Sequence, residues 1–306
     1  MQIATLNVQN LRLRQRQGEY FLHGAWDTDS PEDPELDPID RCLTAELLAD
    51  INADVLALQE VFDQKTLEYF HDEFLLPTGI APYPYRVCLP GNDGRGLDVA
   101  LMSRLRLSNI ESHASLVPAD LGFPAPPGVS ADLPVFRRDC LTATVGAVTL
   151  FVCHFKSPYP EPRKSWTIRR LEALATRRII ERKFTHPRPD LWLILGDLNE
   201  PTRERGETER AISPLESGFA SDLMLRIPKP DRWTYFDPHS GLYHCPDALL
   251  ASPALAERFP DTVPLIVRKG LGLEVERFRG SHLASVGEHR PHASDHAAVT
   301  VEFQGL

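Results

Sequence analysis

The most informative segment of the chain is Leu191-Trp192-Leu193-Ile194-Leu195-Gly196-Asp197-Leu198-Asn199-Glu200. Its first five residues form an apolar run of strand length, which predicts a buried β-strand. Gly196 then permits a turn or the close approach of another segment, and Asp197 and Asn199 follow as polar groups at the strand end. Since Gly, Asp and Asn also favour turns, the decapeptide alone fits a strand-terminating turn as well as a functional site.

The chain has 306 residues, of which 42% are hydrophobic and 25% charged, as in an ordinary globular protein. We predict one domain over residues 1–306, because predicted strands and helices are intermixed to both ends without an internal repeat or a linker. No apolar run approaches the roughly 20 residues needed to span a bilayer, so we expect no membrane span.

The N-terminus and the cysteines favour a reducing cytoplasmic location. Residues 1–7 show no basic segment before an apolar core, so no secretory signal is visible. The cysteines are Cys42, Cys88, Cys140, Cys153 and Cys245. They form no CxxC pair, which argues against a zinc ribbon or a disulfide framework. A secreted mature chain without its leader would show the same pattern.

The charge balance argues against a surface that is basic throughout. There are 33 Lys and Arg residues against 43 Asp and Glu residues, a formal charge of -10, so general attraction to polyanions is not expected. Local basic patches remain possible at Arg137-Arg138, and on a predicted helix that carries Arg169-Arg170, Arg177-Arg178 and Arg182-Lys183. For the helix we favour a solvated face.

Apolar periodicity predicts intermixed strands and helices. The predicted strands cover residues 2–8, 54–60, 82–90, 97–102, 138–145, 147–153, 191–195, 247–250 and 299–301. The predicted helices cover residues 40–53, 64–75 and 166–183. We expect residues 11–39 and 117–134 to be long loops, and residues 200–240 to be mostly loop with one short helix.

Polar side chains lie at the ends of several predicted strands. They are Asn7, Gln59, Glu60, His154, Asp197 and Asn199, with Ser294-Asp295-His296 before the last strand. Each has a structural alternative as a cap or a turn residue. Together, carboxylate and amide oxygens suit Mg²⁺ or Mn²⁺, with Ca²⁺ also possible, rather than zinc. Two histidines add proton-transfer groups, so the set predicts metal-assisted phosphoester hydrolysis.

Other reaction classes lack their motifs in this chain. No GxxxxGK[ST] loop and no GxGxxG after a strand is present, which argues against a nucleotide-dependent transferase. No G-x-S-x-G elbow is present either, which argues against a serine hydrolase.

The ordered motifs resemble the endonuclease/exonuclease/phosphatase superfamily, which is DNase I-like. They are Asn7, Leu58-Gln59-Glu60, His154-Phe155-Lys156-Ser157, Gly196-Asp197-Leu198-Asn199 and Ser294-Asp295-His296. The resemblance covers residues 3 to about 302 and is greatest to the bacterial extracellular-nuclease-like branch. It implies an α/β fold: a four-layer α/β/β/α sandwich of two mostly antiparallel sheets with helices outside.

The resemblance also implies roles for individual residues. Asn7, Glu60 and Asp295 match metal-binding positions. Catalytic positions are matched by His154, Asp197, Asn199, Asp247 and His296. Asp197 would activate or position water with Asn199 as its partner amide, and Asp247 would orient His296. Ala248 departs from the family pattern, which more often has an aromatic residue or a histidine there.

Three further residues resemble substrate-binding positions: Asp98, Arg138 and Lys156. Asp98 and Arg138 would contact phosphate or position His154, and a structural Asp–Arg pair is an equal alternative. The acidic loop Asp27 to Asp40 is a candidate for a second cation, against the usual solvated loop.

We therefore expect a metal-dependent phosphodiester hydrolase, and first a DNA endonuclease that acts by in-line attack of water. The alternative is a phosphodiesterase or phosphatase for a lipid headgroup, an inositol phosphate or a small nucleotide. A catalytically silent binding module is a third hypothesis. The expected partner is nucleic acid or a small phosphodiester, and the expected state is a monomer.

Overall fold

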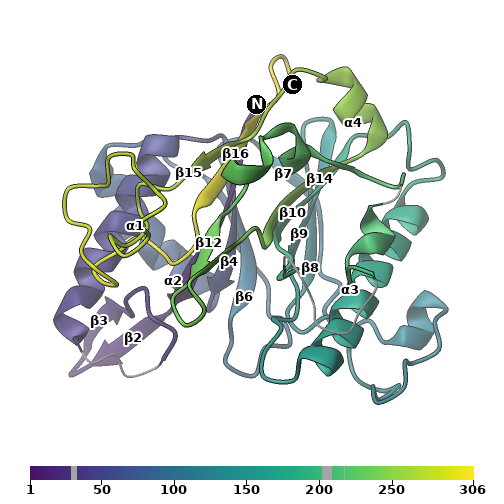
Figure 1. The fold of residues 1–306 in the computed structure, drawn as a ribbon, viewed down its shortest axis with the longest axis horizontal. Coiled ribbons are helices and arrows are strands. Elements are labelled where there is room, and N and C mark those ends of the chain that lie inside the picture. Colours follow the sequence, from purple (N-terminus) through teal and green to yellow (C-terminus); the bar gives the residue numbers. More distant parts are fainter. Residues whose placement is uncertain (29–32, 202–208, 217) are drawn as a thin grey trace.

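Two six-stranded sheets pack face to face, with helices on their outer faces (Figure 1). The computed structural model describes residues 1–28, 33–201, 209–216 and 218–306. Among these residues, no helix is both long and apolar enough to cross a membrane.

The first sheet contains the N-terminal and C-terminal strands. In spatial order it consists of β15 (Leu265–Val267), β16 (Ala298–Glu302), β1 (Gln2–Leu11), β4 (Val55–Val61), β6 (Asp98–Ser103) and β5 (Tyr85–Cys88). β1 and β4 are parallel, and the other neighbours are antiparallel. The parallel pair places the carboxyl ends of two strands at one edge.

The second sheet repeats this plan. In spatial order it consists of β11 (Ser221–Asp222), β14 (Asp247–Ala251), β10 (Trp192–Asp197), β9 (Val148–His154), β8 (Cys140–Val145) and β7 (Leu107–Glu111). β9 and β10 are parallel, and the other neighbours are antiparallel. Both sheets are therefore mostly antiparallel, as expected.

Three apolar cores separate four layers. On β10, Leu193 and Leu195 face the core between the sheets, whereas Trp192 and Ile194 face the helix side. β1 divides in the same way, with Ile3 in the central core and Leu6 in the outer one. Strands that are buried on both faces give continuous apolar runs rather than alternation. This arrangement confirms the α/β/β/α sandwich.

The helices cover the outer faces as predicted. They are α1 (Asp37–Ile51), α2 (Gln64–Phe70), α3 (Pro162–Lys183) and the short α4 (Pro253–Arg258). α1 and α2 lie outside the first sheet, and α3 lies outside the second (Figure 1). A π-helical turn, His71–Leu75, continues α2.

The loop predicted for residues 11–39 is wrong in part. It contains the hairpin of β2 (Leu13–Arg16) and β3 (Glu19–Leu22), and α1 begins at Asp37. Gln17 and Gly18 have φ of 54° and 93° in its turn. Positive φ at both central residues is usual for Asn-Gly or Asp-Gly hairpins, so Gln-Gly gave a weak signal.

Two carboxylates of the acidic loop that suggested a second cation are paired with an arginine. Asp37 and Asp40 are buried, and their carboxylates lie 2.7 and 2.6 Å from a guanidinium nitrogen of Arg290. They therefore form a structural ion cluster. Residues 29–32 lie outside the described residues.

Short elements account for the other omissions. The sequence did not predict β7, α4, β15 or the two-stranded sheet of β12 (Tyr235–Asp237) and β13 (Leu242–His244). The strands among them have three to five residues, too few for a clear period of two.

Candidate active site

The polar strand ends meet where the two parallel strand pairs face each other. β1 and β4 deliver Asn7 and Glu60, and β9 and β10 deliver His154 and Asp197. β1 and β4 both contact β10 across the central core. As a result, residues far apart in sequence lie at one edge of the sandwich.

Asp197 is the centre of this cluster. Its side chain is 2% exposed, and its Oδ2 accepts hydrogen bonds from Nδ2 of Asn7 and Nδ2 of Asn199, each at 3.2 Å. Nε2 of His154 and Nε2 of His296 lie 3.5 and 3.9 Å from the same oxygen. Two amides and two imidazoles therefore converge on one carboxylate oxygen.

Local backbone geometry explains the Gly-Asp-Leu-Asn motif. Gly196 has φ of 129°, and a Cβ there would lie 2.1 Å from the carbonyl oxygen of Cys153. Only glycine allows β9 and β10 to approach in this way. The backbone N–H of Asn199 donates to Asp197 Oδ1 at 2.9 Å, and its Nδ2 also donates to the carbonyl of Phe155 at 3.1 Å. The asparagine thus orients Asp197 and joins the two loops.

His296 is oriented from behind by Asp247. Its Nδ1 lies 2.9 Å from Asp247 Oδ2, which also accepts a hydrogen bond from the hydroxyl of Thr234 at 2.6 Å. Asp247 lies directly opposite Asp197 in the β10–β14 register. The Ser294 hydroxyl donates to the carbonyl of Asn7 and accepts from the His296 N–H, at 2.6 and 3.1 Å. These contacts fix the C-terminal motif against β1.

The two histidines differ in charge. Burial lowers the pKa of His154 well below its usual range, and Arg138 lowers it further, so this imidazole is neutral at neutral pH. Burial also opposes charge on His296, but Asp247, Asp295 and nearby Asp197 outweigh it and raise the pKa well above the usual range. Opposite environments thus assign different protonation states to chemically identical side chains.

The carboxylates repel one another in the absence of a cation. Burial raises the pKa of Asp197 to about 6, with a further contribution from Asp247. Burial also raises the pKa of Asp295 to about 8, reinforced by Asp27, Glu60 and Asp197. A positive ion among these groups would relieve this repulsion.

The residues expected to bind metal fit a hard cation by their chemistry. Glu60 accepts hydrogen bonds from Asn7 Nδ2 at 3.3 Å and from the Asn10 N–H at 2.9 Å. Buried Asn10 Oδ1 has no hydrogen-bond partner among the described residues. No group of three His, Cys, Asp or Glu side chains in the described ranges has metal-binding spacing. Mg²⁺ is commonly held by one or two carboxylates and several waters, so a carboxylate–amide set that includes Asp295 is adequate.

The three predicted substrate-binding residues are not in contact with Asp197 in the described structure. Arg138 pairs with Asp93, Nε to Oδ2 at 3.1 Å, and its charge also acts on the Asp98 carboxyl, so both roles considered for Asp98 and Arg138 stay predictions. Asp98 packs against Gly91, where a Cβ would lie 2.3 Å from Oδ1. Lys156 donates to the carbonyl and hydroxyl of Ser157 at 2.9 and 3.1 Å.

The pKa values of two of these residues, Asp98 and Lys156, are nevertheless shifted. Burial raises the pKa of Asp98 to about 6, and nearby Asp93 adds to the effect. Burial, together with Arg138, lowers the pKa of Lys156 to about 8. Both groups therefore titrate nearer neutrality than exposed groups of their type.

Gln9 is a site residue that the sequence did not identify. Its Nε2 donates to Asp27 Oδ1 at 3.0 Å, and its Oε1 accepts the N–H of Asp295 at 3.2 Å. Nε2 of His292 lies 2.9 Å from the same Oε1. Gln9 has φ of 47°, an unusual conformation for glutamine, and no sequence signal predicts it.

Tyr235 is a second residue beside the site that the sequence did not identify. Its ring centroid lies 4.9 Å from that of His296, and the two residues form an isolated β-bridge. Tyr235 therefore packs directly against a candidate catalytic side chain, from a strand too short to be recognised.

The basic helix is not simply a solvated face. Arg169 and Glu172 on α3 are buried. Glu172 accepts the N–H groups of Arg137 and Lys156 at 2.9 and 2.8 Å, and Arg169 Nη1 donates to the Lys156 carbonyl at 3.0 Å. Part of α3 therefore anchors the loops that lead into the site.

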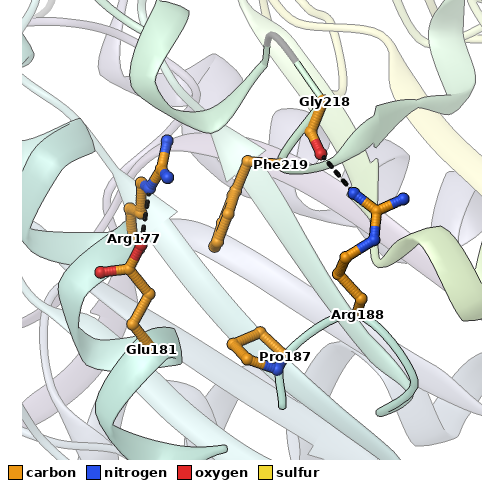
Figure 2. Close-up of a pocket in the computed structure, with 6 residues that line it drawn as sticks. All are labelled: Arg177, Glu181, Pro187, Arg188, Gly218 and Phe219. Atoms are coloured by element: carbon orange, nitrogen blue, oxygen red, sulfur yellow. Dashed lines mark hydrogen bonds and ion pairs between the residues drawn. The ribbon is translucent and has the colours of Figure 1, made fainter.

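Two cavities lie at different distances from this cluster. The larger, about 580 Å³, is lined in part by Gln9, Asp27, Tyr235 and Asp295 and adjoins the cluster. The smaller, about 250 Å³, contains none of the predicted site residues. Figure 2 shows its six lining residues; the two arginines flank the Phe219 ring and are bonded to Glu181 and to the Gly218 carbonyl. The larger cavity is therefore the one relevant to the site.

Comparisons with solved structures agree with this architecture. An endonuclease/exonuclease/phosphatase family protein from Leptotrichia buccalis is 16% identical, with a TM-score of 0.60 and 99% of each chain covered. The 3'-5' exonuclease NExo from Neisseria meningitidis is 20% identical, with a TM-score of 0.55 and 99% coverage of each chain. An AP endonuclease from Archaeoglobus fulgidus is 14% identical, with a TM-score of 0.58 and 99% coverage of each chain.

Sequence comparison gives the family directly. No curated protein matches the chain significantly. The model of the Endonuclease/Exonuclease/phosphatase family matches residues 4–296, which include every predicted catalytic and metal-binding position. The chain therefore belongs to the Endonuclease/Exonuclease/phosphatase family.

Proposed function

We propose that the protein is a divalent-metal-dependent phosphodiesterase that cleaves DNA by in-line attack of water. The observation that carries the proposal is the environment of Asp197, whose Oδ2 is approached by two imidazoles and two side-chain amides. A buried carboxylate with a pKa raised to about 6 is suited to accept a proton from water near neutral pH.

The surrounding side chains divide the remaining tasks. Asn199 and Asn7 orient Asp197 toward the attacking water. His296, kept charged by Asp247, donates a hydrogen bond to a non-bridging phosphate oxygen, where negative charge accumulates. His154 is neutral, and its Nε2–H can donate to the same phosphate or to the leaving oxygen.

Asn7, Glu60 and Asp295 would hold the metal. Mg²⁺ or Mn²⁺, with Ca²⁺ as a further candidate, would neutralise charge on the phosphate oxygens. Without the metal, Asp295 is partly protonated near neutral pH because its pKa is raised to about 8 by burial and by neighbouring carboxylates.

DNA is the proposed substrate, and its support is of two kinds. The structural neighbours described above include a 3'-5' exonuclease and an AP endonuclease. Arg95 is 58% exposed and lies 3.5 Å from the Asp93 carboxylate, Nε to Oδ1, and the Arg12 guanidinium donates to its carbonyl at 2.5 Å. These two arginines are the candidates for contacts with a phosphate backbone. The second candidate is a small phosphodiester, for which the adjoining cavity of about 580 Å³ offers room.

A metal-dependent activity panel tests the proposal. We expect the wild-type protein with Mg²⁺ or Mn²⁺ to nick supercoiled plasmid, and Asp197→Asn to lower kcat by about 10²–10⁴-fold without changing the circular dichroism spectrum. Asp132→Asn, an exposed loop aspartate, is the matched control.

The panel also separates the other hypotheses. Turnover of bis-p-nitrophenyl phosphate without nicking would replace DNA by a small phosphodiester. An absence of turnover on every substrate, with metal binding intact, would indicate a binding module. Full activity of Asp197→Asn, or full activity in excess EDTA, would refute the mechanism.

A further inference from the structure

The larger cavity is built by segments that are distant in sequence. Residues 26–28 form one wall and residues 235–239, from β12 and its turn, form another. Gln9 of β1 and the segment between β15 and β16 complete the lining; that segment contributes Leu271, Gly272, Glu274, Val275, His289, His292 and Asp295. This segment is folded on itself, since the Leu273 N–H donates to the Gly287 carbonyl and the His289 N–H donates to Glu274 Oε2, both at 2.9 Å.

The cavity continues directly from the candidate catalytic cluster. Asp295 lines the cavity and belongs to the carboxylate cluster. Tyr235 lines it as well, while its ring packs against His296 at 4.9 Å. A group that is attached to a phosphate at Asp197 would therefore enter this space.

The lining chemistry disfavours a second phosphate. Away from the metal-binding Asp295, Asp27 and Glu274 contribute carboxylates. None of the described residues that line the cavity is a lysine or an arginine, and its histidines are His239, His289 and His292. Arg290 approaches the ring of Trp26, 5.7 Å from its centroid, but its guanidinium is paired with Asp37 and Asp40. An anion would be repelled here.

The same lining suits a planar group with hydrogen-bond donors. Trp26, Tyr235 and Phe236 provide aromatic side chains on which a flat ring can stack. Carboxylate oxygens accept hydrogen bonds and cannot donate them when ionised, so they match the N–H groups on the edge of a nucleobase. A volume of about 580 Å³ is within the range of small-molecule sites.

We propose that this cavity binds an unpaired nucleobase that adjoins the scissile phosphate. This inference rests on the proposed function, and it specifies the substrate of that site. A base in a duplex is stacked and paired, so it must leave the helix before it can enter such a pocket. The enzyme therefore cleaves single strands and frayed ends in preference to intact duplex, in keeping with its net charge of -10.

Two chromogenic esters provide the kinetic test. Cytidine 5'-(p-nitrophenyl phosphate) carries a base, whereas bis-p-nitrophenyl phosphate carries none. We expect Trp26→Ala to lower the ratio of their kcat/KM values, base-bearing over base-free, by about tenfold, the loss expected for one stacked base. Trp26→Phe should restore most of the ratio because it retains an aromatic face. Tyr85→Ala, an exposed aromatic residue on β5, is the control.

Binding of free cytidine, measured by calorimetry on the same proteins, makes the test independent of catalysis. We expect wild type and Trp26→Phe to bind cytidine and Trp26→Ala to lose this binding. A short single-stranded oligonucleotide should be cleaved at least tenfold faster than its duplex.

The outcomes distinguish the two proposals. If bis-p-nitrophenyl phosphate is not hydrolysed with any metal but cytidine binds in a Trp26-dependent manner, the proposed function fails and the base pocket stands. If the ester is hydrolysed, but the ratio is unchanged in Trp26→Ala and cytidine does not bind, the base pocket is wrong. The base pocket would also be wrong if tetramethylammonium chloride inhibited hydrolysis of the base-bearing ester and cytidine did not, since the site would then select cations.

Discussion

Replacement of Asp247 by asparagine tests how His296 obtains its charge. The carboxylate of Asp247 lies 2.9 Å from Nδ1 of His296, and both side chains are buried. With charge centres roughly 4 Å apart and an effective dielectric constant of about 20, the pair interaction is about 4 kcal/mol. Its loss should lower the pKa of His296, because Asp247 is the largest of the neighbouring charges that hold it up.

The substitution also disturbs the tautomer of the ring. Asp247 Oδ2 accepts from Thr234 and lies against His296 Nδ1. An asparagine oxygen in this place keeps both hydrogen bonds without the negative charge, whereas an asparagine NH2 in this place donates to an unprotonated Nδ1 and so changes the tautomer. We expect kcat to fall by about 10²–10⁴-fold, with little change in the affinity for metal.

The measurement combines kinetics with nuclear magnetic resonance. The pH titration of the His296 ring is followed in wild type and Asp247→Asn, and turnover of bis-p-nitrophenyl phosphate is measured with Mg²⁺. Asp132→Asn serves as the control, and thermal unfolding establishes that both variants are folded. A folded Asp247→Asn protein with kcat within about threefold of wild type, or an unchanged His296 titration, would refute the reasoning.

Three further predictions concern metal, pH and stability. Removal of divalent metal by EDTA should abolish turnover, and Mg²⁺ or Mn²⁺ should restore it; activity that survives dialysis against EDTA would contradict the metal assignment. The pKa of Asp295 is raised from 3.8 to about 8, so in EDTA the stability that its protonated form contributes is present below pH 4 and is lost as the pH rises through about 8. The Tm difference between wild type and Asp295→Asn should therefore shrink between pH 5 and 9. A Tm difference that grows over this range would contradict the prediction. Buried Arg41 donates to the carbonyls of Val8, Gln9, His23 and Gly24, so Arg41→Ala should reduce the free energy of unfolding by about 3–5 kcal/mol. Urea denaturation measures this loss, with exposed Arg16→Ala as the control. A loss below about 1 kcal/mol would be inconsistent with this role.

Much of the fold could be predicted from local patterns. Continuous apolar runs such as Leu191–Leu195 marked strands buried on both faces, and helical periodicity placed α1 to within three residues at its start. The β2–β3 hairpin was missed because its positive-φ turn is Gln17-Gly18 rather than Asn-Gly. Strands of three residues carry too little pattern to be distinguished from loops.

Candidate site residues could be predicted where a short motif directly follows, precedes or begins a strand. Asp197 and Asn199 stand out because Gly196 marks a close approach between strands. Gln9 and Tyr235 have no such marker, since their position beside Asp295 and His296 arises from contacts between segments more than 60 residues apart in sequence. The pairing of Arg138 with Asp93 was equally undetermined by spacing.

The strand-end chemistry and the order of the motifs can be read from the chain, because each motif is a short local pattern of apolar and polar residues. The protonation states and the shape of the cavity depend on tertiary contacts. Burial and neighbouring charges keep His154 neutral and His296 charged. The cavity walls come from residues near 27, 236 and 274, and only the packing of the sheets brings those segments together.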